Sequence, residues 1–153
     1  MRIPRKREAS IIFASLLFTG ASLISTRANA SGCDEAVANT LSVISSKGGT
    51  IEKVGYFPVE TKSPFPGSKH LRISLDSSGK ARVAVANIMN SPLLNMDLAK
   101  KVLLACPGVS SISFHVWNTD EMNTFYRFRD GAVRRHVCVN DFSQSGWGYG
   151  PCP

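Results

Sequence analysis

The fold is easiest to read in residues 91–116, whose sequence is SPLLNMDLAKKVLLACPGVSSISFHV. The first part predicts a helix, because Ser91 suits the cap, Pro92 suits the first turn, and apolar residues recur every three to four positions at Leu94, Leu98, Val102 and Ala105. Pro107 and Gly108 end this helix. The second part predicts a half-buried strand, because Ile112, Phe114 and Val116 alternate with Ser and His.

The residues before this stretch predict one more helix and three more strands. A helix is expected over residues 34–46, where Val37, Leu41 and Ile44 share one stripe. Residues 51–57 and 71–75 predict strands on either side of a proline-rich loop. Residues 81–88 are expected to form a third strand, with Val83 and Val85 pointing inward.

The residues after it predict a hairpin of two strands, 122–129 and 132–139, joined by the turn signal Asp130-Gly131. A two-residue turn would place Arg127 opposite Arg134 and Phe125 opposite His136. The expected order is therefore helix, three strands, helix, three strands. This order predicts an α+β fold, with an antiparallel sheet of about six short strands and the helices packed on one face.

Residues 1–30 have the layout of a secretory signal peptide. A basic start is followed by the apolar run 11–24 and by a polar segment that ends in Ala-Asn-Ala, so cleavage is expected after Ala30. Residues 31–153 would then form a single domain, exported to the periplasm or the extracellular space. A minor alternative is a lipid anchor on Cys33, which follows a degenerate lipoprotein box.

The charge left after such a cleavage is small. Five of the 18 basic residues and one of the 11 acidic residues lie in residues 1–30, so the rest of the chain carries 13 and 10, a net charge of +3. Nucleic-acid binding requires a dense cationic surface, which this excess does not supply. No segment of residues 31–153 is apolar enough to predict a membrane span.

Four cysteines in an exported chain indicate two disulfides. Of the three possible pairings we predict Cys33–Cys106 and Cys138–Cys152, because antiparallel helices would bring Cys33 to the end of the second helix. Metal binding is not expected, because no Cys-x-x-Cys or His-x-x-x-His spacing occurs.

Two groups of residues are candidates for ligand binding. Arg127, Arg129, Arg134 and His136 would form a basic hairpin face for an anion, unless it is an ordinary solvated face. Trp117, Trp147 and Tyr149 would offer a platform for sugar rings, unless the tail aromatics fold back and cover the sheet.

Catalytic motifs are missing from the sequence: there is no Gly-x-Ser-x-Gly, no His-Glu-x-x-His and no phosphate-binding glycine loop. A grouping of Ser113, His115 and Asp120 would depend on geometry alone. We therefore expect no cofactor and a non-catalytic binding or scaffolding module of the cell envelope, with an acidic glycan or an envelope component as its partner. The alternative is a hydrolase that acts on a cell-wall or glycan substrate.

The chain also resembles a group of small exported proteins known mostly from cyanobacterial genomes. The resemblance rests on Asn-Ser-Pro-Leu-Leu at 90–94, Cys-Pro at 106–107, the strand at 109–116, Cys138, and the tail Trp147-Gly148 with Cys152. It covers the C-terminal half. It implies an exported domain with disulfides and carries no assigned activity.

Overall fold

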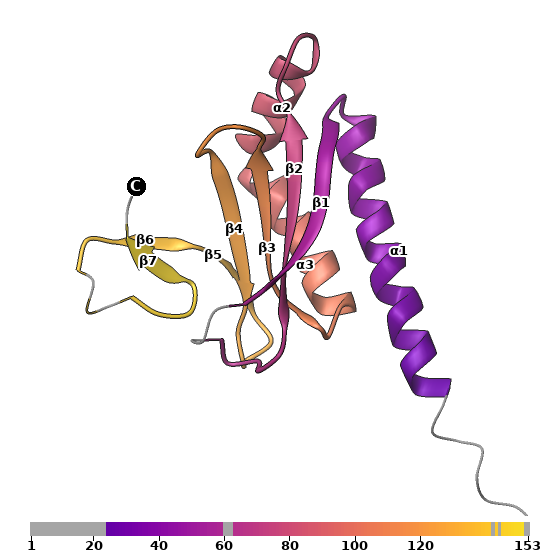
Figure 1. Ribbon diagram of the computed structural model, residues 1–153, viewed down its shortest axis with the longest axis vertical. Coiled ribbons are helices and arrows are strands. Elements are labelled where there is room, and N and C mark those ends of the chain that lie inside the picture. Colours follow the sequence, from indigo (N-terminus) through magenta and orange to yellow (C-terminus); the bar gives the residue numbers. More distant parts are fainter. Residues whose placement is uncertain (1–23, 60–62, 142, 144, 152–153) are drawn as a thin grey trace, which may run out of the picture.

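The protein is described by a computed structural model that covers residues 24–59, 63–141, 143 and 145–151 (Figure 1). Three helices and seven strands occur in this part of the chain. In order, they are α1 Ile24–Ser46, β1 Thr50–Pro58, β2 Lys69–Asp76, α2 Ala81–Met89, α3 Pro92–Ala105, β3 Val109–Val116, β4 Met122–Arg127, β5 Val133–Arg135, β6 Val137–Val139 and β7 Tyr149–Pro151.

The first five strands form one mixed sheet in the order β1-β2-β3-β4-β5. Neighbours are antiparallel except β2 and β3, which run parallel. The α+β class is confirmed, but the expectation of a wholly antiparallel sheet is wrong. Parallel neighbours need a long crossover connection, and α2 and α3 supply it.

The segment expected to be a third strand is helix α2. Its buried residues are Val85, Ile88 and Met89, spaced three and four apart, whereas Val83 is 70% exposed. This is the spacing of one helical face. The misassignment arose because Val83 and Val85 alone also fit the alternation of a strand.

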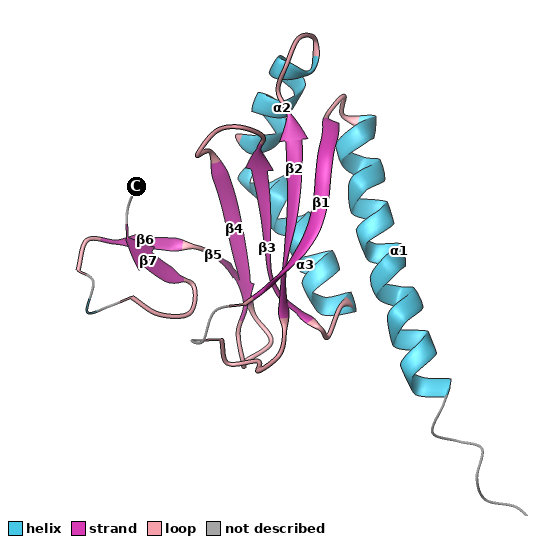
Figure 2. Cartoon of the chain, in the orientation of Figure 1, coloured by secondary structure: helices cyan, strands magenta, loops and turns pink. Residues whose placement is uncertain are grey.

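The hydrophobic core lies between the helices and one face of the sheet (Figure 2). The sheet contributes Leu71, Ile73 and Leu75 from β2 and the aligned Ile112, Phe114 and Val116 from β3. Helices α1 and α3 cover these residues, with Ile44, Leu98 and Val102 fully buried. Alternation along β2 and β3 therefore leaves their polar residues on the opposite, open face.

Helix α1 starts ten residues earlier than expected, at Ile24, and so runs through the expected cleavage point at Ala30. The signal peptide lies mostly outside the described residues and stays a prediction. No helix in the described part of the chain is both long and apolar enough to cross a membrane.

The disulfide Cys33–Cys106 is confirmed and ties α1 to the end of α3. The sulfur of Cys33 is thus bonded to another sulfur, so it cannot at the same time carry a lipid. The second predicted pair, Cys138–Cys152, includes Cys152, which lies outside the described residues.

The hairpin is shifted by one residue from the predicted register. Arg127 pairs with Val133, Tyr126 with Arg134 and Phe125 with Arg135. The Phe128 amide donates to the Ala132 carbonyl and the Gly131 amide to the Phe128 carbonyl, with Gly131 at φ 78°. This is a three-residue loop with a glycine in the left-handed conformation, and its odd length moves Arg127 and Arg134 to opposite faces.

The predicted last strand is also divided in two. Residues 133–135 complete the sheet as β5, while 137–139 turn away as β6 and pair in parallel with β7. These two short strands form an arm beside β4 and β5 (Figure 1).

Candidate ligand groove on the open face of the sheet

The open face of the sheet carries a shallow groove of about 200 Å³. Residues from three adjacent strands line it, together with the residue that follows β3: Lys53, Gly55, Phe57, Arg72, Ser74, His115 and Trp117. Strand pairing brings them together, because Gly55 lies opposite Arg72, Lys53 opposite Ser74, and Ser74 opposite His115. Its floor is therefore β2, and its sides are β1 and the end of β3.

One end of the groove is built from a glycine, a phenylalanine and an arginine. A Cβ atom on Gly55 would lie 3.1 Å from the ring of Phe57, so the absence of a side chain lets this ring lie over Gly55. The guanidinium carbon of Arg72 lies 5.0 Å from the centre of the same ring, which is the distance of a cation–π contact. The ring of Phe57 therefore supports Arg72 from one side.

The positive charges of this groove have no acidic partner among the described residues. The two ion pairs of the described residues join Lys101 to Asp97 and Arg134 to Asp130, and involve neither Lys53 nor Arg72. The lining residues include no Asp or Glu. In addition, the Nε atom of Arg72 is buried without a hydrogen-bond partner. The groove is therefore a site of unbalanced positive charge.

The other end combines an indole with a histidine held in place. Trp117 is 38% exposed, and its backbone amide donates to the Leu75 carbonyl. The Nε2 atom of His115 donates to the Thr119 carbonyl at 2.9 Å, while Nδ1 lies 3.4 Å from the hydroxyl of Ser74. An aromatic surface and polar groups are thus available beside the two cations.

Two other hollows lie on the helix side, and in each the basic residue is already paired. One, of about 150 Å³, is lined by Asn95, Asn123 and Arg135, and Arg135 donates to the amide oxygen of Asn123. The other, of about 260 Å³ between α1 and α3, includes Lys101, which pairs with Asp97. Of these three hollows in the described part of the chain, the groove on the open face is the one that joins unpaired cations to aromatic rings.

Next to the groove, His70 connects β2 to β3. Its Nδ1 lies 2.8 Å from the hydroxyl of Ser111, and its Nε2 lies 2.9 Å from that of Ser113. Burial, with the charge of Arg72 nearby, lowers the pKa of His70 to about 4. Ser111 and Ser113 are both buried, at 2% and 0% exposure. This His–Ser cluster therefore links β2 to β3 by hydrogen bonds and does not present an accessible nucleophile.

Ser113, His115 and Asp120 do not form a catalytic grouping. Ser113 is bonded to His70, and His115 to Thr119 and Ser74. Among the described residues, no three His, Cys, Asp or Glu side chains are arranged to hold a metal ion.

The four residues of the predicted basic face are not brought together. Arg127 points to the helix side, where its guanidinium donates to the Leu103 and Pro107 carbonyls at 3.1 and 2.8 Å. Its Cζ also lies 4.5 Å from the centre of the Phe65 ring. Burial lowers the pKa of Arg127. This arginine holds the end of α3 against β4.

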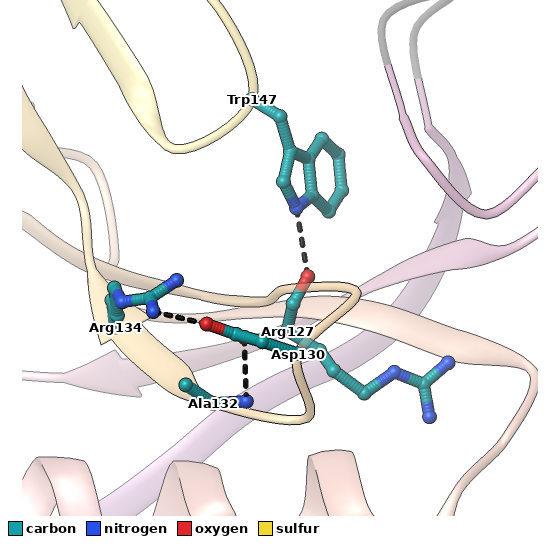
Figure 3. Close-up of polar contacts among 5 residues, drawn as sticks. All are labelled: Arg127, Asp130, Ala132, Arg134 and Trp147. Carbon is teal, nitrogen blue, oxygen red and sulfur yellow. Dashed lines mark hydrogen bonds and ion pairs between the residues drawn. The ribbon is translucent and has the colours of Figure 1, made fainter.

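Arg134 is on the open face and forms an ion pair with Asp130, whose carboxylate also accepts from the Ala132 amide (Figure 3). The hydrogen bond from the Ala132 amide lowers the pKa of Asp130 most, and the hydrogen bond from Arg134 lowers it further.

Arg129 is exposed in the loop of the hairpin. His136 packs between Tyr126 and the backbone of Gly150, and burial lowers its pKa.

The three residues of the predicted aromatic platform are also apart. Trp147 contacts the Tyr126 ring edge-on, with the ring centres 4.8 Å apart, and donates to the Arg127 carbonyl at 2.8 Å (Figure 3). Trp117 follows the opposite end of β3, because Ser111 pairs with Tyr126 and His115 with Met122. Tyr149 is exposed on β7. Trp147 thus folds back onto the sheet, and Trp117 alone lines the groove.

Sequence reasoning did not find Lys53, Phe57 or Arg72. The signal for Arg72 was present, since His70, Arg72 and Ser74 are the polar residues of an alternating strand. Lys53 and Phe57 belong to a strand with a bulge between Ile51 and Lys53, which disturbs the alternation.

Comparison with protein-family models, with curated proteins and with solved structures finds no match to this chain. Its function is therefore inferred from the groove.

Proposed function

We propose that this chain is an exported, non-catalytic binding module that holds an acidic glycan in the groove on its open sheet face. The observation that carries this proposal is that unpaired cations, Lys53 and Arg72, share one groove with two exposed aromatic rings, Phe57 and Trp117. The disulfide Cys33–Cys106 is compatible with export, because disulfides persist in oxidising compartments.

The chemistry of such a groove suits an acidic sugar polymer. Cations without acidic neighbours attract carboxylate or sulfate groups, and arginine binds such oxygens through two parallel N–H bonds. The flat faces of Phe57 and Trp117 provide apolar surface for the C–H face of a sugar ring. A binding role also agrees with the described lining residues, because glycoside hydrolysis generally uses two carboxyl groups and these residues include neither Asp nor Glu.

The test is retention on alginate and heparin columns at low salt. The variant Lys53→Gln/Arg72→Gln should elute at lower salt than the wild type on at least one of them. A matched control, Arg82→Gln/Lys100→Gln, removes the same charge from exposed positions on α2 and α3 and should elute like the wild type. Equal losses in both variants would show that only net charge matters, and no loss in either would contradict the proposal.

The hydrolase alternative is tested on the same substrates. Wild-type protein should release no product from alginate or from isolated cell wall. Turnover that His115→Ala or His136→Ala abolishes would overturn the non-catalytic role.

A further inference from the structure

We infer that the groove selects a polyuronate, a polymer with one carboxylate on each sugar ring, over sulfated glycans and over polyanions without rings. This inference rests on the proposed function and names the ligand class of the same site. It follows from the size of the groove, from the ratio of cations to aromatic rings, and from the way Arg72 is held.

The groove is small. Its volume of about 200 Å³ lies below the 300–1,000 Å³ typical of sites for drug-sized ligands. Along β1 it extends only from Lys53 to Phe57, which at about 3.3 Å per residue is roughly 13 Å. This space suits one or two sugar rings of a longer polymer, so the charges on those rings decide the affinity.

The groove offers few cations for so short a segment. Lys53 and Arg72 are its two permanent positive charges, and Phe57 and Trp117 are its two aromatic rings. The hairpin arginines do not add to it, because Arg134 is paired with Asp130 and Arg127 faces the helices. The groove thus offers one cation for each aromatic ring. A polyuronate carries one carboxylate on each sugar ring, so the charges balance when one sugar lies on each aromatic ring. A heavily sulfated polymer would place more charge in this space than the groove can neutralise.

Arg72 is held in a way that suits an anionic group with two oxygen atoms in one plane, such as a carboxylate. The ring of Phe57 lies against its guanidinium, and its Nε atom is buried. The donors left for a ligand are therefore those on the two Nη atoms. These two nitrogens can donate parallel bonds to the two oxygens of one carboxylate, which a lysine ammonium cannot reproduce.

Gly55 acts as a positioning residue for this arrangement. A methyl group there would lie 3.1 and 3.2 Å from two carbon atoms of the Phe57 ring. The ring would have to move, and the support of Arg72 would move with it. We expect Gly55→Ala to weaken polyuronate binding although it removes no charge and no ligand-binding side chain.

The experiment compares four polymers at equal ionic strength: polygalacturonate, heparin, poly-L-glutamate and neutral dextran. Titration calorimetry on the full domain should give the tightest binding for polygalacturonate. Arg72→Lys keeps the charge and should weaken that binding by roughly tenfold, the loss expected for one charge-assisted hydrogen bond. Trp117→Ala should weaken binding of polygalacturonate and leave that of poly-L-glutamate unchanged, because the latter has no ring to stack. Melting curves confirm that each variant is folded.

The outcomes separate the two proposals. Heparin or poly-L-glutamate binding as tightly as polygalacturonate, with the binding still dependent on Arg72, would overturn the selection of a polyuronate and leave the glycan-binding groove in place. Wild-type affinity of Arg72→Lys and Gly55→Ala would also overturn it. Binding of every polymer that is insensitive to Lys53→Gln/Arg72→Gln, or no binding at all, would contradict the proposed function itself.

Discussion

At the scale of single residues, the histidine between β2 and β3 acts through hydrogen bonds in its neutral form. His70 contacts two buried serine hydroxyls, and a neutral imidazole can donate to one and accept from the other. Protonation would place a charge in a largely buried site, close to the positive charge of Arg72. This explains the direction in which its pKa is shifted.

The pKa of His70 predicts a loss of stability in mild acid. Its folded pKa, about 4, lies below the ordinary 6.5, so the unfolded chain binds the proton more readily. The contribution of His70 is complete above pH 6.5 and is lost as the pH falls toward 4. Between pH 7.5 and 5 the free energy of unfolding should decrease by about 2 kcal/mol from this residue.

Denaturant unfolding at several pH values checks this prediction. His70→Gln should reduce the pH dependence between 7.5 and 5, and His136, whose pKa is also lowered by burial, should account for the part that remains. The carboxyl groups with lowered pKa, Asp76 and Asp130, act below this range and do not interfere. A slope unchanged in His70→Gln would contradict the assignment.

The two arginines that the hairpin pattern treats as equivalent have different surroundings. The guanidinium of Arg127 donates to two carbonyls at the end of α3, where a cation also interacts favourably with the helix dipole. Arg127→Ala should therefore destabilise the protein by about 2 kcal/mol. Arg134→Ala removes an exposed ion pair and should have a clearly smaller effect. Thermal melting of the two variants side by side measures the difference, and equal effects would contradict it.

At the scale of secondary-structure elements, α2 can be distinguished from the strand that its sequence first indicates. In a helix, Val83 is exposed and Val85 is buried at 1% exposure, whereas a strand would place both on the same face. Val85→Ser should destabilise the protein by about 2–3 kcal/mol, and Val83→Ser by no more than about 0.5 kcal/mol. Chemical denaturation of both variants tests this, and similar losses would favour a strand.

At the scale of the whole molecule, the disulfide joins α1 to the end of α3 across 73 residues of chain. Closing a loop of this length stabilises a protein by roughly 4 kcal/mol on the chain-entropy model. Cys33→Ala/Cys106→Ala should lower the melting temperature strongly. It should leave polymer binding intact at temperatures where the variant is folded, because the groove is on the other side of the sheet. Peptide mapping without reduction that paired Cys33 with any other cysteine would contradict the assignment.

The sequence by itself determined the elements that depend on near neighbours. Helix α3 follows from the proline in its first turn, its apolar spacing and its Pro-Gly end, although the Ser91 side chain forms no capping hydrogen bond, and β2 and β3 follow from their alternation. The pairing of Cys33 with Cys106 followed once two helices were expected on one face. Caps, turns and periodicity act over a few residues, so they can be read from one segment at a time.

The tertiary structure alone decided how these elements combine. The parallel pairing of β2 with β3 depends on a crossover through α2 and α3, and the faces of Arg127 and Arg134 depend on one additional residue in a loop. The groove needs Lys53, Arg72 and His115 from three strands, which meet only after the sheet has formed. Strand pairing is an interaction between distant segments, and a shift of one residue reverses every side chain, so no local pattern contains it.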